Sequence, residues 1–179
     1  MVIRAVGQPP DGRSLVAGHI QQMLTPGGNH PTLGPVRPED MRISAGAPVY
    51  TLVDRELDHR VTLAEFEICS WRYLLFDNDC NVWEAALGPL EDRKMAFLGV
   101  CRSPLAPVAV EALRFAEQLP DVTCKDYELR FLDLPAVHFR ALWLYLPDDN
   151  LVIPLDGNRP RDFHIHSIST GPVRRHIQT

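Results

Sequence analysis

The sequence has almost no lysine: Lys94 and Lys125 are the only two among its 18 basic residues, and the rest are arginines. The formal net charge is -5, so the chain lacks the basic surplus typical of nucleic-acid-binding proteins. It also has no run of about 18 apolar residues and no secretory pattern at its start. We therefore expect a cytoplasmic protein that binds neither nucleic acid nor membrane, and the preference for arginine suggests a GC-rich bacterial source.

Signatures of common catalytic sites are missing as well. The chain contains no GxSxG, HExxH or phosphate-binding glycine motif, which are the local patterns of many hydrolases, zinc proteases and nucleotide enzymes. Its four cysteines form no CxxC pair, which argues against a zinc ribbon or a thioredoxin-type site. We interpret them as reduced and mostly buried thiols. A protein without catalytic activity is favoured, and no cofactor is predicted.

The most informative segment present, Asp126 to Leu155, predicts three consecutive strands separated by turn residues. From Ala141 to Leu146 both faces are apolar, because side chains alternate along a strand. Such a strand is either covered on both faces or exposes an apolar face to a partner. Pro147 to Asn150 supplies a turn. Pro154 cannot donate a ladder hydrogen bond, so the last strand ends there or lies at an edge that could recruit a partner strand.

Hydrophobic periodicity predicts further strands and helices. Val108, Ala112, Phe115 and Leu119 fall at i, i+4, i+7 and i+11, which predicts one buried helical stripe. A capping-box spacing between Thr62 and Glu65 predicts a helical turn. The remaining expectations are a short helix over Ser14–Leu24 and strands at residues 2–6, 49–53, 71–76, 82–87, 95–101 and 163–168.

This order of elements predicts an α+β fold: a two-layer domain with a mixed, mainly antiparallel sheet and one principal helix. Prolines and glycines recur every few residues from Thr25 to Pro48, which indicates an irregular connection. We therefore divide the chain into an N-terminal arm at residues 1–47, a core domain at 48–157 and a C-terminal tail at 158–179. Deletion of the arm is expected to change assembly while leaving the core folded.

Four aromatic residues are the candidate ligand or partner surface. Trp71 and Tyr73 share one face of their predicted strand, and Trp143 and Tyr145 share one face of theirs. Large aromatic side chains dominate binding sites and cores alike. The four residues therefore either form the floor of a groove or fill the core, and the sequence leaves both readings open.

The candidate metal site is the segment that contains Asp162, His164 and His166. These residues alternate and would point to one face of a strand, and imidazole with carboxylate suits zinc or iron. The HxH pattern of cupin-type sites expects a glutamate soon afterwards, and none follows here. The opposing interpretation is a solvated tail, because ligand geometry and not composition makes a metal site.

Two functional hypotheses remain. The first is a noncatalytic bacterial interaction or assembly protein that docks on a protein partner or a second copy through its terminal extensions and an apolar sheet surface. The alternative is a small ligand-binding protein or a metal-dependent enzyme with a pocket of aromatic side chains.

Overall fold

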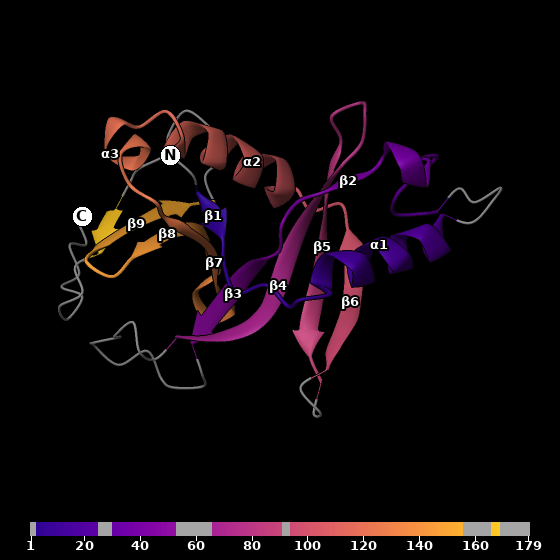
Figure 1. Cartoon of the computed structure of the whole chain (residues 1–179), viewed down its shortest axis with the longest axis horizontal. Helices are drawn as coiled ribbons and strands as arrows, with labels where there is room; N and C mark the ends of the chain where they lie inside the picture. Colours follow the sequence, from indigo (N-terminus) through magenta and orange to yellow (C-terminus); the bar gives the residue numbers. More distant parts are fainter. Residues whose placement is uncertain (1–2, 25–29, 53–65, 91–93, 156–165, 169–179) are drawn as a thin grey trace.

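The computed structural model describes residues 3–24, 30–52, 66–90, 94–155 and 166–168. Within these residues one ten-stranded sheet has the order β10-β9-β8-β7-β3-β4-β5-β6, with β1 beside β7 and β2 beside β4 (Figure 1). The strands are β1 (Arg4–Ala5), β2 (Arg42–Ile43), β3 (Ala47–Leu52), β4 (Phe66–Phe76), β5 (Val82–Pro89), β6 (Met95–Cys101), β7 (Glu128–Leu134), β8 (Phe139–Leu146), β9 (Asp149–Pro154) and β10 (His166–Ile168). Strands β1 and β3 pair parallel with β7 and the other pairs are antiparallel, so the predicted mixed, mainly antiparallel sheet is confirmed.

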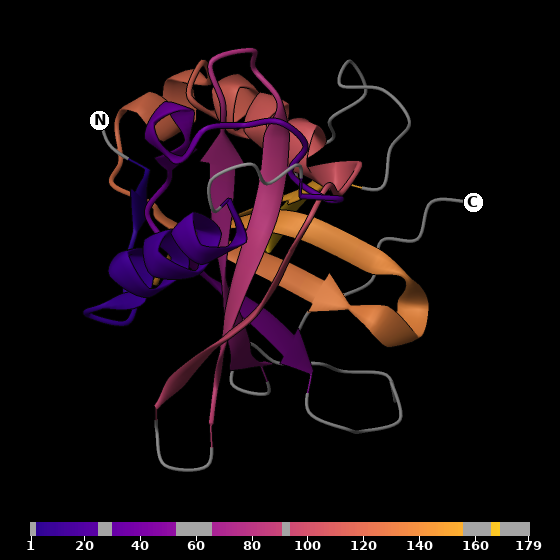
Figure 2. The same ribbon diagram turned by 90° about the vertical axis from the view of Figure 1, so that its right-hand side faces the viewer.

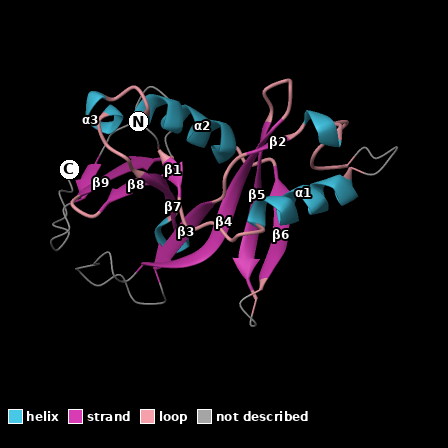
Figure 3. Ribbon diagram, viewed as in Figure 1, coloured by secondary structure: helices cyan, strands magenta, loops and turns pink. Residues whose placement is uncertain are grey.

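Three helices accompany the sheet: α1 (Gly12–Met23), α2 (Leu105–Ala116) and the short α3 (Pro120–Thr123). Two 3-10 turns, at Pro38–Asp40 and Pro135–Val137, complete the described elements. Figure 3 distinguishes the helices from the strands. This combination of a mixed sheet with few helices confirms the α+β class.

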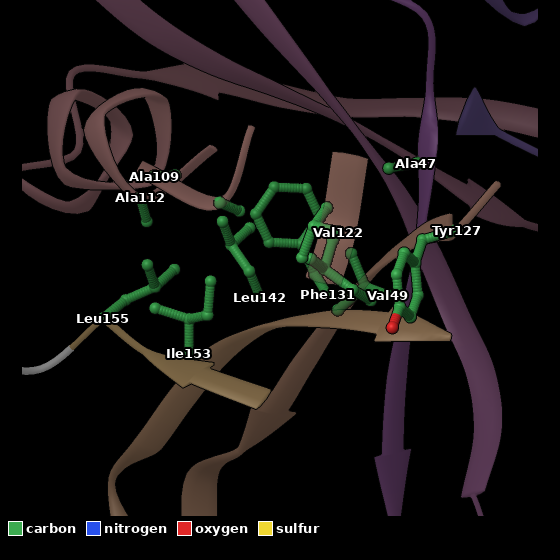
Figure 4. Packing of buried hydrophobic residues seen from close by; sticks show 12 residues of the cluster. Ala47, Val49, Ala109, Ala112, Val122, Tyr127, Phe131, Leu142, Ile153 and Leu155 are labelled. Carbon is green, nitrogen blue, oxygen red and sulfur yellow. The ribbon is translucent and has the colours of Figure 1, made fainter. Parts of the chain in front are cut away.

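One hydrophobic core lies between α2 and the half of the sheet formed by β3, β7, β8 and β9. Ala109 and Ala112 of α2 point toward Leu142, Ile153 and Leu155 on the sheet (Figure 4). The buried residues of α2 are Ala106, Ala109, Ala112 and Ala116. Because alanine is small, the helix can approach the strands closely. The predicted stripe is therefore wrong in part: the alanines turn inward, and Val108, Phe115 and Leu119 lie beside them.

A second core lies beneath α1. Val16, Ile20 and Leu24 are buried there against Tyr73 and Leu75 of β4 and their neighbours on β5. These residues belong to the segment that we predicted to be an N-terminal arm, and that segment also supplies β1 and β2. The structure thus places much of the arm in the core. The expectation that residues 1–47 could be removed without unfolding is not supported.

The two long helices cover opposite faces of β4 and β5. Tyr73 and Leu75 pack with α1, whereas Leu74 packs with Ala106 of α2. Residues that alternate along a strand point to opposite faces, so α1 and α2 are separated by the sheet. Figure 2 shows α1 on one side of these strands. The expected two-layer arrangement is therefore not confirmed where β4 and β5 run.

The three strands predicted between Asp126 and Leu155 are confirmed as β7, β8 and β9. The turn between β8 and β9 is shorter than predicted, because β8 ends at Leu146 and β9 already begins at Asp149. Strand β9 does end at Pro154, but β10 pairs with Asn150 to Val152. Of the position predicted for strand addition, Val152 is therefore not open, whereas no described strand pairs with the outer side of Ile153 and Pro154. No helix in the described part of the chain is long and apolar enough to cross a membrane.

Candidate functional site

Strand β6 is one end of the sheet, and β10 is the other. Among the described residues no strand pairs with the outer edge of β6. Unpaired N–H and C=O groups along such an edge are a template for another chain. Both ribbon views show the β5–β6 hairpin extending away from α2 (Figures 1 and 2).

Two exposed leucines lie on the β5–β6 hairpin. Leu98 is 61% exposed and Leu90 is 53% exposed. Leu98 sits between the two halves of the β5–β6 ladder, where Ala86 pairs with Gly99 but Leu87 pairs with Phe97. This bulge redirects the leucine over Gly88, where an added Cβ would lie 2.7 Å from Leu98 Cδ1. We call Gly88, Leu90, Leu98 and the outer edge of β6 the β6 edge patch.

The composition of the strand makes the patch unusual for an edge. Natural edge strands are commonly protected by charged residues, especially lysine, by proline or by a β-bulge, and of these devices β6 has the bulge at Leu98. Met95–Cys101 contains neither a charged residue nor a proline, and the nearest charges are Lys94 and Arg102 at its two ends. The strand therefore offers backbone groups and apolar side chains together.

The predicted aromatic residues fall into two separate clusters. Trp143 and Tyr145 are neighbours on the sheet face opposite α2, with ring centroids 5.6 Å apart in an edge-to-face arrangement. Tyr73 is fully buried beneath α1. Trp71 packs at the same cluster and donates a hydrogen bond from Nε1 to the Gly7 carbonyl oxygen at 3.0 Å. The structure does not bring the four residues together in one groove.

Arg130 organises the cluster around Trp143. Its guanidinium carbon lies 3.4 Å from the ring centroid of Tyr145 and 4.9 Å from those of Tyr50 and Trp143. Glu128 pairs with the same guanidinium at 2.8 Å. Burial raises the pKa of Tyr50, although the positive charge of Arg130 opposes this shift. Since the cation is stacked and already paired, we interpret the cluster as packing on this face.

The candidate metal residues cannot be assembled into a site. Asp162 and His164 lie outside the described residues, and His166 begins strand β10. Among the residues that the structure describes, no group of three or more histidine, cysteine, aspartate or glutamate side chains could hold a metal ion.

A buried charge cluster was missed by the sequence analysis. Arg72 of β4 lies 3.6 Å from both Glu84 of β5 and Asp133 of β7, and Arg140 of β8 lies 3.2 Å from Asp133. Oxygen Oε1 of Glu84 is buried without a hydrogen-bond partner. The nearby Cys101 is exposed, as are the other three cysteines, so the expectation of mostly buried thiols is wrong. Partial desolvation, and next the negative charge of Glu84, raise the pKa of the Cys101 thiol. The charge cluster joins β4, β5, β7 and β8.

No protein-family model, no curated protein and no solved structure matches this chain.

Proposed function

We propose that this chain is a noncatalytic interaction protein that associates with a second copy of itself through the β6 edge patch. The observation that carries the proposal is a seven-residue strand at the end of the sheet that has no charged residue and carries Leu98, which is 61% exposed. Burial of this apolar surface and pairing of the open backbone groups both favour association.

The chemistry of the patch favours a second copy over a partner of opposite charge. In a two-fold dimer the same surface meets itself, so any charge at its centre would meet a like charge. An uncharged centre avoids this repulsion. The N-terminal segment is a weaker candidate for docking, because Val16 and Ile20 already pack inside the chain's own core.

The test is the mass of the untagged protein in solution across a range of concentrations, measured by native mass spectrometry and light scattering. We expect a dimer that dissociates on dilution, and we expect Leu98→Lys to be monomeric at concentrations where the wild type is dimeric. A lysine at this position introduces a charge at the edge without removing a core side chain.

Val137→Lys is the matched control, because Val137 is also an exposed apolar residue, 48% exposed, but lies in the 3-10 turn before β8. It should leave the dimer intact. A monomeric wild type at every concentration, or equal dissociation by the two lysine variants, would overturn the proposal.

A further inference from the structure

A cavity of about 360 Å³ opens between α2 and the far end of the β4–β5 hairpin. Its size is within the lower range of small-molecule sites. Strand β2 closes one side, where Arg42 pairs with Phe76 of β4. It is separate from the β6 edge patch, because none of the residues of that patch lines it.

The helix side of the cavity is one face of α2. Pro107, Val110, Glu111 and Arg114 follow each other at i, i+3, i+4 and i+7, a spacing that places them in one row along the helix. The buried alanines of α2 lie on a neighbouring row. The helix therefore turns one face to the sheet and offers a second one to the cavity.

The lining of the cavity combines apolar surface with charged side chains. Phe76, Val82 and Val110 contribute apolar surface, and Val82 is buried. Arg42 and Arg114 are exposed, and among the described residues neither is in an ion pair. Arg102, by contrast, donates a hydrogen bond to Asn81 near this turn. Two arginines that no described residue pairs with, beside apolar lining, match an anion with an apolar body.

We propose that this cavity binds a small carboxylate with an apolar body, with the carboxylate held by Arg42 and Arg114. A single negative charge suits the site better than a phosphate, because Asp77 and Glu111 also line it and would repel a second charge. The carboxylate of Asp77 is already hydrogen-bonded within the hairpin turn. Its two oxygens accept hydrogen bonds from the backbone and side-chain nitrogens of Asn81 at 2.8 and 2.7 Å.

The probe is 3-phenylpropanoate, titrated into isotope-labelled full-length protein and followed by amide chemical shifts. We expect saturable shifts at Val82, Val110 and their neighbours. Arg42→Gln and Arg114→Gln should each weaken binding by about tenfold, since each removes a charge-assisted hydrogen bond. The control is Arg13→Gln, because Arg13 is an exposed arginine of α1 that does not line the cavity. It should bind as the wild type does.

Thiol protection in the wild-type protein tests the same site without any substitution. Cys80 lines the cavity, whereas Cys124 is exposed elsewhere. Saturating 3-phenylpropanoate should slow alkylation of Cys80 severalfold and leave that of Cys124 unchanged.

Four results would overturn the proposal. The first is equal affinity for the neutral amide 3-phenylpropanamide, which would show that the negative charge is not recognised. The second is tighter binding of inorganic phosphate than of the carboxylate. The third is unchanged affinity in both arginine variants. Equal protection of the two cysteines would likewise overturn it.

Discussion

The indole Nε1 of Trp143 donates a hydrogen bond to Oδ1 of Asn150 at 3.0 Å, and both residues are buried between strands β8 and β9. Asn150 is 0% exposed, and its Nδ2 has no hydrogen-bond partner. The Asn150 side chain therefore accepts the hydrogen bond of the buried indole N–H, while its own buried amide N–H group has no partner among the described residues. The pair fixes the position of Trp143 at the centre of the aromatic face.

Replacing Asn150 by alanine should lower the free energy of unfolding by about 1–3 kcal/mol, because it leaves the buried Trp143 N–H without an acceptor. Urea denaturation followed by tryptophan fluorescence measures this change. Asn78→Ala is the control, since Asn78 is exposed and bonds only Asp40 on the surface, and it should change stability by less than about 0.5 kcal/mol. Similar losses in the two variants would contradict this account of the Trp143–Asn150 pair.

The β8–β9 hairpin shows what the sequence could predict and what it could not. Alternation and apolar runs located all three strands from Asp126 to Leu155, because these patterns depend on neighbours along the chain. Asp149 and Asn150 were interpreted as turn residues, since both types favour turns. Their actual partners, Tyr127 and Trp143, come from outside the turn, and no local signal identifies them.

The same limit applies to the candidate sites. The β6 strand was predicted, but its place at the end of the sheet depends on strand order, which periodicity does not encode. Of the edge expected near Val152 to Leu155, the structure pairs only Val152 with β10, and periodicity does not encode this pairing either. The pairing of Arg72 with Glu84 and Asp133 likewise joins residues from three strands. Only the fold shows that they meet.

Asp149 should make stability depend on pH in the acid range. Lys125 and Tyr127 donate hydrogen bonds to the Asp149 carboxylate and lower its pKa, and the bond from Lys125 has the larger effect. A lowered pKa in the folded state adds stability above the ordinary aspartate value of about 3.9, and this stability is lost as the pH falls through the folded pKa. The wild type should therefore exceed Asp149→Asn in stability at pH 6, and the difference should shrink at pH 3.

Urea denaturation at the two pH values measures this difference. Asp148→Asn is the neighbouring control, because Asp148 is exposed in the turn and should contribute no comparable change. A gap between wild type and Asp149→Asn that stays constant from pH 6 to pH 3 would show that the carboxylate charge is not what Lys125 and Tyr127 stabilise.

Helix α1 should be part of the cooperative fold and not a detachable arm. Ile20 is 2% exposed and packs beneath the sheet with Leu75 and Trp83. Ile20→Ala should cost about 2–5 kcal/mol of unfolding free energy, as is usual for large-to-small changes in a core. Gln21→Ala on the exposed side of the helix is the control. If Ile20→Ala unfolds at the same urea concentration as the wild type, α1 does not stabilise the core.

Tyr73 packs closely against Gly12 and Gly46, and double variants can separate the contacts of its hydroxyl from those of its ring. Its hydroxyl is buried, and no described residue forms a hydrogen bond with it. A Cβ added at Gly12 would collide with this hydroxyl and lie 3.2 Å from ring atom Cζ, whereas a Cβ at Gly46 would collide with both the hydroxyl, at 2.5 Å, and the ring, including Cε1 at 2.6 Å. Tyr73→Phe alone should raise the free energy of unfolding by about 1 kcal/mol, because it removes an unpaired buried oxygen.

Removing the hydroxyl should rescue the substitution at Gly12 more than the one at Gly46. Gly12→Ala should destabilise the wild type by more than it destabilises Tyr73→Phe, with a coupling energy of about 1 kcal/mol. Gly46→Ala should couple less to the hydroxyl, because the phenyl ring still occupies the space that the new methyl group needs. Urea denaturation of the four single and double glycine variants measures both couplings. Equal coupling at Gly12 and Gly46 would mean that the hydroxyl does not set the packing of α1 on β4.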